Sequence, residues 1–446
     1  MRAPNARDTA LRVLLSCRTA GAWAHAALRA QLRRDGLSGP EAALCSRIVY
    51  GVMQNRLLLD FYLGAYCSQK VDHLQPPLLE ILRIGAYQIL FLDKIPHSAA
   101  VNQAVEQAKD NGRAKAAGLV NAVLRQLSRN KVHLPRIPDQ DALHSLSIRY
   151  SHPKWLVKRL QAILGPETEA CLAADNAPAP LTIQVNPLKA AAEELTAELE
   201  ASGVIVRPHP WVSGCLELDH VGDLTALEPF RMGKFLVQDP AARLVSQIAG
   251  VEPGMRVLDV CAAPGGKSFS AAFAMEDQGE ILACDLHENK LKRIREGAER
   301  LGLACIQTTA ADGRGFRPEW EAAFDVVLVD APCSGFGIIR KKPDVRYKKP
   351  DDLFALPVIQ RAILDNAARY VRPGGTLVYS TCTILPEENE GVSDSFLAEH
   401  PDFCRTPFSL SGPVGETEGQ VTLWPHRHGT DGFFFARLRR KDDGNL

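Results

Sequence analysis

Apolar residues in the first part of the chain recur at the spacing of an α-helix. Leu11 and Leu14 begin such a pattern, the same spacing returns at residues 48–52, and residues 78–89 form a broader apolar segment typical of a buried helix. Glycine and proline residues separate these segments and mark the turns between them. Residues 1–130 are therefore predicted to form an all-α helix bundle.

The pattern changes in the next part of the chain. Residues 131–180 contain spaced prolines between short helical segments and end in the sequence Ala-Pro-Ala-Pro, as a connector would. Leu181–Val185 then alternates like a strand, a charged helix follows at about 190–201, and Val204–Arg207 has the pattern of a second strand. Residues 131–239 are thus predicted to combine a connector with a small α+β domain.

From residue 240 onward, a strand–loop–helix pattern repeats along the chain. The candidate strands are Arg256–Val260, Ile281–Asp285, Ala304–Thr308, Val326–Asp330 and Thr376–Ser380. Alternation of this kind indicates a doubly wound sheet of mostly parallel strands with helices on both faces. The third predicted domain, residues 240–446, therefore has an α/β, Rossmann-like architecture.

The distribution of charge along the chain differs from its total. The chain of 446 residues holds 52 Lys and Arg against 52 Asp and Glu, and this zero net charge by itself argues against a nucleic-acid binder. Residues 1–130, however, hold 17 basic and 9 acidic residues, whereas 131–239 hold 10 and 14 and 240–446 hold 25 and 29. The predicted helical domain is therefore a basic module. The hydrophobic content of 46% excludes a disordered chain.

The cysteines and the N-terminal sequence indicate the cellular compartment in which the protein is expected. The 11 cysteines form no C-x-x-C pair, so neither a zinc site nor a disulfide framework is indicated, and no metal is expected. Arg12 interrupts the first apolar run, so this run does not form a signal-peptide core, and no stretch of 18 apolar residues indicates a membrane span. We expect a cytoplasmic protein without a membrane partner.

A glycine-containing loop follows the first strand of the predicted sheet. It reads Cys261-Ala-Ala-Pro-Gly-Gly-Lys267, and such a loop allows backbone N–H groups to approach a ligand closely. Asp285 ends the second strand, where a carboxylate can accept hydrogen bonds from ribose hydroxyls. Asp312 follows the third strand, within reach of an adenine edge, and Asp330 ends the fourth. Carboxylates at three successive strand ends favour a ligand site over a plain turn.

Two common nucleotide-binding motifs fit this loop less well. It lacks the G-x-G-x-x-G pattern, which disfavours a dinucleotide. Gly266-Lys267-Ser268 matches the end of a Walker A loop, but Cys261 stands where that motif requires a glycine. An adenosyl ligand without a pyrophosphate is the better fit.

Two cysteines follow neighbouring strands of the same predicted sheet. Cys333 lies in Asp330-Ala-Pro-Cys-Ser-Gly335, and Cys382 lies in Tyr379-Ser-Thr-Cys-Thr383. Because ligands bind at the carboxyl ends of the strands, both thiols are expected on the same rim as the glycine loop. This arrangement suits methylation of a pyrimidine at carbon 5. A thiolate adds to carbon 6 and makes carbon 5 nucleophilic, a carboxylic acid stabilises the adduct, and a base removes the carbon 5 proton afterwards.

These motifs together resemble the signatures of the RNA 5-methylcytosine methyltransferases that use S-adenosylmethionine. The sequence Gly429-Thr-Asp-Gly-Phe-Phe-Phe-Ala436 is similar to the closing strand of that family. The segments 96–106 and 118–125 resemble the NusB antiterminator fold, and the combination resembles the Sun/Fmu-type ribosomal RNA methyltransferases. The resemblance implies a multidomain fold: an all-α NusB-like helix bundle, a small α+β linker domain and an α/β Rossmann-like methyltransferase domain.

The resemblance also implies roles for individual residues. Cys382 would be the nucleophile, Cys333 would help to release the product, and Asp330 would complete the catalytic set. DNA cytosine methyltransferases instead use the cysteine of the Pro-Cys motif as nucleophile, and spacing alone does not decide between the two. The residues expected to contact or surround S-adenosylmethionine are Cys261, Ala262, Ala263, Pro264, Gly265, Gly266, Lys267, Asp285, Asp312 and Asp330.

A basic strip follows the Cys333 loop and is predicted to bind RNA at the mouth of the active site. Basic residues interleaved with an aromatic ring suit contacts with phosphates and stacking on a base, whereas an isolated charge run is more often simply solvated. The residues concerned are Arg340, Lys341, Lys342, Arg346, Tyr347, Lys348 and Lys349.

The predicted activity is methylation of carbon 5 of a specific cytosine in 16S ribosomal RNA, through a covalent cysteine–cytosine intermediate. The expected substrate is a hairpin loop, because an unpaired base leaves its stack at least cost, and the enzyme is expected to act as a monomer. Two alternatives remain: the same chemistry on transfer RNA or another RNA, and a non-catalytic RNA-binding assembly factor built around the helical domain.

Overall fold

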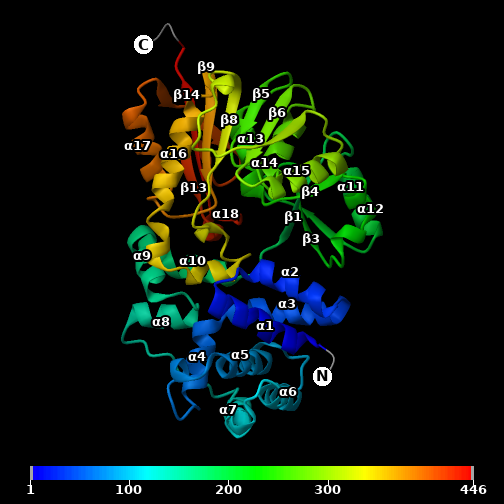
Figure 1. Cartoon of the computed structure of the whole chain (residues 1–446), viewed down its shortest axis with the longest axis vertical. Coiled ribbons are helices and arrows are strands. Elements are labelled where there is room, and N and C mark those ends of the chain that lie inside the picture. The colour runs from blue at the N-terminus through cyan, green and yellow to red at the C-terminus, as the bar shows by residue number, and fades with distance from the viewer. Residues whose placement is uncertain (1–3, 443–446) are drawn as a thin grey trace. The chain divides into compact units, whose positions relative to one another are not determined.

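The computed structural model describes residues 4–442, so positions 1–3 and 443–446 of the predicted terminal domains lie outside the described residues. By packing, the chain divides into two units (Figure 1). Unit 1 contains the chain up to Ala177 together with Ile339–Lys348, and unit 2 contains Pro178–Ile338 and the chain from Lys349 onward. This division is coarser than the three predicted domains, whose boundaries at 130 and 239 stay predictions.

Unit 1 is helical throughout its ordered elements. Its α-helices are α1 (Ala6–Ala20), α2 (Ala24–Asp35), α3 (Gly39–Gln54), α4 (Arg56–Gly64), α5 (Pro76–Phe91), α6 (His97–Asp110), α7 (Ala117–Arg129), α8 (Ala142–Arg149), α9 (Lys154–Leu164) and α10 (Thr168–Asn176). Helix α5 is buried along nearly its whole length, and α1, α3, α4, α6 and α7 pack against it. This explains why its sequence is apolar on every side rather than along one stripe.

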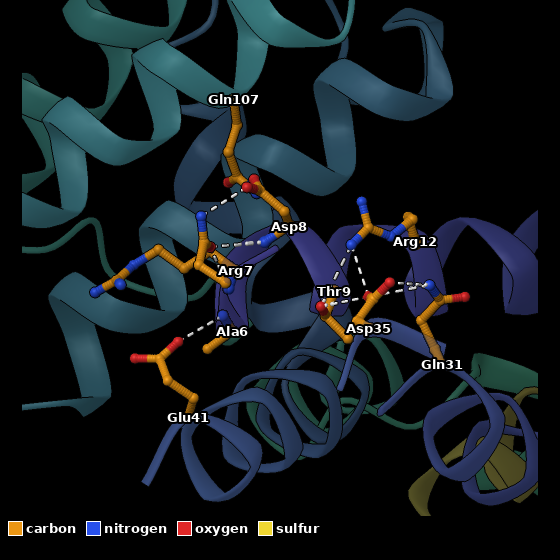
Figure 2. Close-up of polar contacts among 10 residues, drawn as sticks. Ala6, Arg7, Asp8, Thr9, Arg12, Gln31, Asp35, Glu41 and Gln107 are labelled. Carbon is orange, nitrogen blue, oxygen red and sulfur yellow. Dashed lines mark hydrogen bonds and ion pairs between the residues drawn. The ribbon is translucent and has the colours of Figure 1, made fainter. Parts of the chain in front are cut away.

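Polar contacts fix the start of α1 within this bundle (Figure 2). The carboxylate of Asp35, at the end of α2, accepts hydrogen bonds from Thr9 Oγ1 at 2.7 Å and from Arg12 Nη2 at 2.6 Å. The side-chain amide of Gln107, on α6, donates to Asp8 Oδ1 at 3.0 Å. These bonds tie one turn of α1 to the end of the next helix and to α6, which follows much later in the chain.

The segment Ile339–Lys348 completes unit 1. It contains the 3₁₀ helix η7 (Pro343–Tyr347), which packs on α3. The Arg346 side chain is fully buried, and its Nη1 atom donates to the backbone oxygens of Gln54 and Tyr150, each at 3.1 Å, and to Asn176 Oδ1 at 2.9 Å. A buried guanidinium therefore holds three parts of unit 1 together.

Unit 2 begins with a small antiparallel sheet. Its strands β1 (Leu181–Val185), β2 (Ile205–Pro208), β3 (Cys215–Asp219) and β4 (Phe235–Val237) lie in the order β2-β3-β1-β4. The helices of this part are α11 (Ala192–Ala201) and α12 (Glu228–Arg231). Leu195 and Leu199 of α11 share an apolar core with Ile183 of β1 and Phe235 of β4, as expected for an α+β domain.

A second sheet forms the rest of unit 2. Its strands are β5 (Arg256–Asp259), β6 (Glu280–Asp285), β7 (Ile306–Ala310), β8 (Phe324–Asp330), β9 (Val371–Thr381), β10 (Phe403–Arg405), β13 (Gln420–Leu423) and β14 (Phe433–Arg440). The order β10-β14-β9-β8-β5-β6-β7 is parallel from β9 to β7, whereas β14 runs antiparallel to β9 and also pairs with β13. The short strands β11 (Phe408–Leu410) and β12 (Gly415–Thr417) pair separately.

Helices cover both faces of this sheet (Figure 1). Val326 and Leu328 of β8 pack with α13 (Pro240–Ala249), α14 (Gly266–Ala274) and α15 (Glu288–Leu301). Val327 and Val329 pack instead with α16 (Leu356–Ala368) and α17 (Glu390–Glu399). Burial on both faces explains the continuous apolar runs of these strands and confirms the predicted doubly wound α/β arrangement. Among the described residues, no helix is both long and apolar enough to cross a membrane.

Candidate active site

The glycine loop connects β5 to α14. Cys261, Ala262, Ala263 and Pro264 form its first part, and the Ala263–Pro264 peptide bond is cis. Gly265 has a φ of +110°, and a Cβ atom added there would lie 2.5 Å from the ring of Phe269. Only glycine therefore fits this turn. Gly266 and Lys267 begin α14, so the first backbone N–H groups of this helix have no acceptor within the helix.

Asp259 lies beneath this loop and is fully buried. Its Oδ2 accepts a hydrogen bond from Ser268 Oγ at 2.7 Å, whereas Oδ1 has no hydrogen-bond partner among the described residues. Burial raises the pKa of Asp259 to about 7, and the bond from Ser268 and the charge of Lys267 oppose this rise. A buried polar atom without a protein partner calls for a further partner, such as a water molecule or a ligand.

The other two predicted cofactor carboxylates differ in exposure. Asp285, at the end of β6, is 7% exposed, and its Oδ1 accepts from the backbone N–H of His287 at 3.0 Å and lies 3.2 Å from Lys290 Nζ. Asp312, just after β7, is exposed, and its hydrogen bonds with Arg314 lower its pKa. Both residues follow strand ends as predicted, and their contacts with a cofactor stay predictions.

Asp330 is paired with the lysine of the glycine loop. Lys267 Nζ lies 2.6 Å from Asp330 Oδ2, and Ser380 Oγ donates to Asp330 Oδ1 at 3.1 Å. Burial alone would lower the pKa of Lys267, but the Asp330 carboxylate raises it, with a further contribution from Cys382. The ion pair with Asp330 therefore keeps Lys267 protonated, and the catalytic role expected for Asp330 stays a prediction.

The two predicted catalytic cysteines meet at this rim. Cys333 Sγ lies 3.2 Å from Cys382 Sγ, and both are thiols rather than parts of a disulfide. The hydrogen bond with Cys382, together with burial, raises the pKa of Cys333 well above its ordinary value. Cys333 is therefore a neutral thiol, and either sulfur can be the donor in this hydrogen bond. The arrangement places two sulfur atoms side by side at one rim of the sheet.

Cys261 belongs to the same electrostatic environment. Burial raises the pKa of its thiol, and the carboxylates of Asp259, Asp330 and Asp285 raise it further. Cys261 is therefore a neutral thiol. The shared influence of three carboxylates shows that the ends of β5, β6 and β8 converge on this loop, as the sequence predicted.

Hydrogen bonds from side chains and backbone fix the loops that carry the two cysteines. Ser334 Oγ lies 2.7 Å from Thr383 Oγ1, and the N–H of Gly337 donates to the carbonyl of Cys382 at 3.0 Å. A Cβ atom on Gly337 would lie 1.8 Å from the carbonyl oxygen of Gly432, so this close approach requires glycine. The glycine-rich segment before β14 therefore packs directly on the Cys333 loop.

Two buried residues of this region were not predicted from the sequence. Glu388 Oε2 accepts from the backbone N–H of Ser334 at 2.8 Å and from Gln360 Nε2 at 2.9 Å. Gln360 Nε2 also lies 3.0 Å from the carbonyl oxygen of Pro332. The available signal was weak: Glu388 follows Glu387 in a polar sequence that reads as a solvated turn. Only the fold reveals that the Glu388 side chain is buried.

The structure corrects part of the predicted RNA-binding strip. Arg346 is fully buried and hydrogen-bonded within unit 1, so it cannot form the exposed phosphate contact that was expected. The Tyr347 hydroxyl donates to the backbone oxygen of Met53 at 2.8 Å, and the guanidinium of Arg56 lies 4.9 Å from its ring centre. The strip is a nearly continuous basic run in the sequence, but Arg346 and Tyr347 at its centre contribute to the packing of unit 1 instead.

The remaining members of the strip are less buried. Lys342 and Lys349 are exposed, and Arg340, Lys341 and Lys348 are partly buried. Lys348 Nζ lies 4.9 Å from the ring centre of Trp23 in unit 1. Because the strip belongs to unit 1 up to Lys348 and to unit 2 from Lys349 onward, its expected place at the active-site mouth stays a prediction.

Family models match three parts of the chain. Residues 247–439 match the model described as 16S rRNA methyltransferase RsmB/F, and residues 4–129 match the NusB family. Residues 152–225 match the ferredoxin-like domain of RsmF/B-like methyltransferases. These matches confirm the NusB-like helical domain, the small α+β domain and the methyltransferase domain that the sequence motifs predicted.

Relatives match the chain over nearly its whole length. A probable ribosomal RNA small subunit methyltransferase B from Bacillus subtilis is 38% identical over 99% of this chain and 100% of its own. The ribosomal RNA small subunit methyltransferase B of Vibrio cholerae is 35% identical over 90% of this chain and 89% of its own. The solved structure of PH0851 is similar with a TM-score of 0.81 and 30% identity over 99% of this chain and 100% of its own. The chain belongs to the RsmB/F family of ribosomal RNA methyltransferases.

Proposed function

We propose that this methyltransferase modifies carbon 5 of a specific cytosine in 16S ribosomal RNA, through a covalent bond between Cys382 and the base. Cytosine 967 is the expected target, and a hairpin loop is the expected substrate. The observation that carries the proposal is the 3.2 Å separation of the Cys333 and Cys382 sulfur atoms beside the Asp330–Lys267 pair. The similarity to ribosomal RNA small subunit methyltransferases supports an rRNA substrate. The pair of thiols supports methylation through a covalent intermediate.

The residues of the glycine loop fit S-adenosylmethionine. The turn at Gly265 leaves backbone N–H groups accessible at the start of α14, and Asp285 presents a carboxylate at the end of the neighbouring strand. The Oδ1 atom of Asp259 is buried without a protein partner behind the loop. S-adenosylmethionine supplies an electrophilic methyl group when bound. The loop residues 261–267 and Asp285 would hold it, with Asp312 and Asp330 nearby.

The first step of the proposed reaction is the addition of Cys382 to the base. The Cys382 thiolate adds to carbon 6 of the base, and the ring electrons shift so that carbon 5 becomes nucleophilic. The ammonium of Lys267, held by Asp330, stabilises the negative charge that this addition places on the ring. The Lys267 charge also favours the thiolate form of a nearby cysteine, as nucleophilic catalysis requires.

Cys333 is suited to the last step, the removal of the proton from carbon 5. The hydrogen bond with Cys382 is the largest cause of its raised pKa, and this bond is lost once Cys382 is bound to carbon. Cys333 then loses its own proton to solvent more readily, and its thiolate accepts the proton from methylated carbon 5. The electrons of that C–H bond re-form the C5–C6 double bond, and the Cys382–carbon bond breaks with its electron pair on sulfur.

A cellular experiment tests the target. Methylated cytosines in 16S rRNA are mapped in cells that lack the protein, and in the same cells carrying the wild-type chain or Cys382→Ala. The proposal expects one cytosine to lose its methyl group, to regain it with the wild type and not with the variant. Loss of methylation only in transfer RNA would identify the alternative substrate, and unchanged methylation would favour an assembly factor.

A biochemical experiment tests the roles of the thiols. With 16S rRNA from the deleted cells and S-adenosylmethionine, Cys333→Ala is expected to retain RNA in a denaturation-resistant adduct, and Cys382→Ala to form none. The opposite pattern would exchange the roles of the two cysteines, as in the DNA cytosine methyltransferases.

A further inference from the structure

A buried carboxylate lies directly behind the loop that carries Cys333. Glu388 is 1% exposed, and its Oε2 atom receives hydrogen bonds from the Ser334 backbone N–H at 2.8 Å and from Gln360 Nε2 at 2.9 Å. Burying a carboxylate is costly unless it is hydrogen-bonded, and a bond to a charged group is stronger than one between neutral groups. The fold therefore places a strong acceptor at one particular backbone N–H.

Gln360 also fixes the peptide unit that precedes Cys333. Gln360, on α16, is fully buried, and its Nε2 atom donates to the carbonyl oxygen of Pro332 at 3.0 Å as well as to Glu388. Gln360 is thus hydrogen-bonded to Pro332, the residue before Cys333, and Glu388 to Ser334, the residue after it. The peptide units that set the direction of the Cys333 side chain are both fixed by side chains from outside the loop.

The cluster is anchored to the strand that leads to the second thiol. The hydroxyl of Tyr379, on β9, donates to the backbone oxygen of Glu388 at 2.6 Å, and Tyr379 is fully buried. Cys382 follows three residues later in the chain, just beyond the end of β9. Glu388 is therefore connected to the loops of both sulfur atoms, and its charge also acts on Cys333, whose pKa it helps to raise after the larger effects of Cys382 and burial.

We propose that Glu388 is a positioning residue that, with Gln360, holds Cys333 within reach of the adduct on Cys382. This inference rests on the proposed function of the two cysteines. Glu388 touches neither the base nor the cofactor in this role. It acts by fixing the peptide units on both sides of Cys333, so that the thiol is in place when the carbon 5 proton has to be removed.

The test is Glu388→Gln, which keeps the shape of the side chain and removes its charge. The amide oxygen of Gln can still accept both hydrogen bonds, but bonds to a neutral acceptor are weaker than bonds to a carboxylate, by about tenfold in the corresponding equilibrium. We expect kcat to fall by about this factor, while the fraction of enzyme held as a denaturation-resistant adduct with 16S rRNA rises. Addition of Cys382 to the base should persist, because this step does not need Cys333.

Two further variants separate positioning from general damage. Gln360→Leu preserves bulk on α16 but removes the donor to both Pro332 and Glu388, and it should accumulate the adduct in the same way. Glu390→Gln changes a neighbouring carboxylate that accepts from Thr422 Oγ1, away from the Cys333 loop, and should behave as the wild type. A protein that is merely destabilised would lose adduct and product in equal proportion.

The outcomes distinguish this inference from the function on which it rests. If Cys333→Ala traps the adduct and Glu388→Gln turns over at the wild-type rate without trapping it, Glu388 has no positioning role. If Glu388→Gln loses adduct and product equally, its role is structural only. If Cys333→Ala itself traps no adduct, the proposed role of Cys333 fails and the inference falls with it.

Discussion

The guanidinium of Arg346 donates a hydrogen bond of 2.9 Å to the side-chain oxygen of Asn176, a residue 170 positions earlier in the chain. The same nitrogen also lies 3.1 Å from the backbone oxygens of Gln54 and Tyr150. Removal of the guanidinium would take this donor from Gln54 O and Asn176 Oδ1, whereas Tyr150 O would keep its bond from Asn176 Nδ2 at 2.9 Å. Arg346 is therefore part of the interior of unit 1, although it lies in a run of exposed and half-exposed cations.

Arg346→Ala is expected to lower the free energy of unfolding by at least ~2 kcal/mol, because unsatisfied buried polar groups cost about 1–3 kcal/mol each. Chemical denaturation followed by circular dichroism measures the change. Lys342→Ala is the matched control, since this exposed lysine of the same strip should change stability by no more than ~0.5 kcal/mol. Equal stability of the two variants would contradict the structural role of Arg346.

Lys267→Met is expected to reduce both adduct formation and methyl transfer by about 100-fold, the usual cost of deleting a group that stabilises developing charge. The reason is that Asp330 loses its ion-pair partner and the ring of the adduct loses a nearby positive charge. Single-turnover assays with 16S rRNA measure both quantities. Lys292→Met, which changes a lysine paired with Glu296 on the surface of α15, should leave both rates unchanged.

The separation of the two catalytic sulfurs predicts sensitivity to thiol oxidants. Cys333 Sγ and Cys382 Sγ lie 3.2 Å apart, and a disulfide needs about 2 Å. Diamide should therefore take two electrons and two protons from this pair, join the sulfurs and abolish methylation. Peptide mapping by mass spectrometry identifies the link, and dithiothreitol should restore activity. Cys404→Ser, at an exposed cysteine, should respond like the wild type; a link through Cys404 would refute the prediction.

Asp259 predicts a particular dependence of stability on pH. Burial raises its pKa to about 7 in the folded protein, whereas an unfolded aspartate has a pKa of about 3.9. Between these values the folded state binds the extra proton, so this group stabilises the fold at low pH and its contribution is lost as the pH rises through about 7. In Asp259→Asn this contribution is absent. Melting temperatures of the cofactor-free proteins should therefore fall less between pH 4 and 7 in the variant; parallel curves would contradict the assignment.

The features predictable from sequence were those set by local pattern. The strand Leu181–Val185 has the bounds expected from its alternation, and the central strands of the large sheet follow from apolar runs between helices. The meeting of Cys333 and Cys382 was also predictable, because each follows a parallel strand and the carboxyl ends of such strands share one edge. Their roles in catalysis stay predictions.

Features set by contacts between distant segments were not predictable in this way. Glu388 reads as a solvated acid, and only the packing of α16 against its loop brings Gln360 to it. Arg346 reads as one cation among several, and only the fold supplies Asn176 as its acceptor. The same reason applies to the Lys267–Asp330 ion pair, since both residues were expected at the site but their contact joins segments that are distant in the sequence.

The discontinuity of unit 1 has a consequence for synthesis of the chain. Its helices up to α10 emerge from the ribosome first, but the segment that supplies Arg346 follows roughly 170 residues after Ala177. At a translation rate of about 5–20 residues per second, about 10–30 s pass between the synthesis of the helices and that of the segment Ile339–Lys348. During that interval Gln54 O and Asn176 Oδ1 lack the donor that Arg346 supplies. Co-translational folding of the N-terminal helices therefore ends only after the strand that leads to Cys333 has been synthesised.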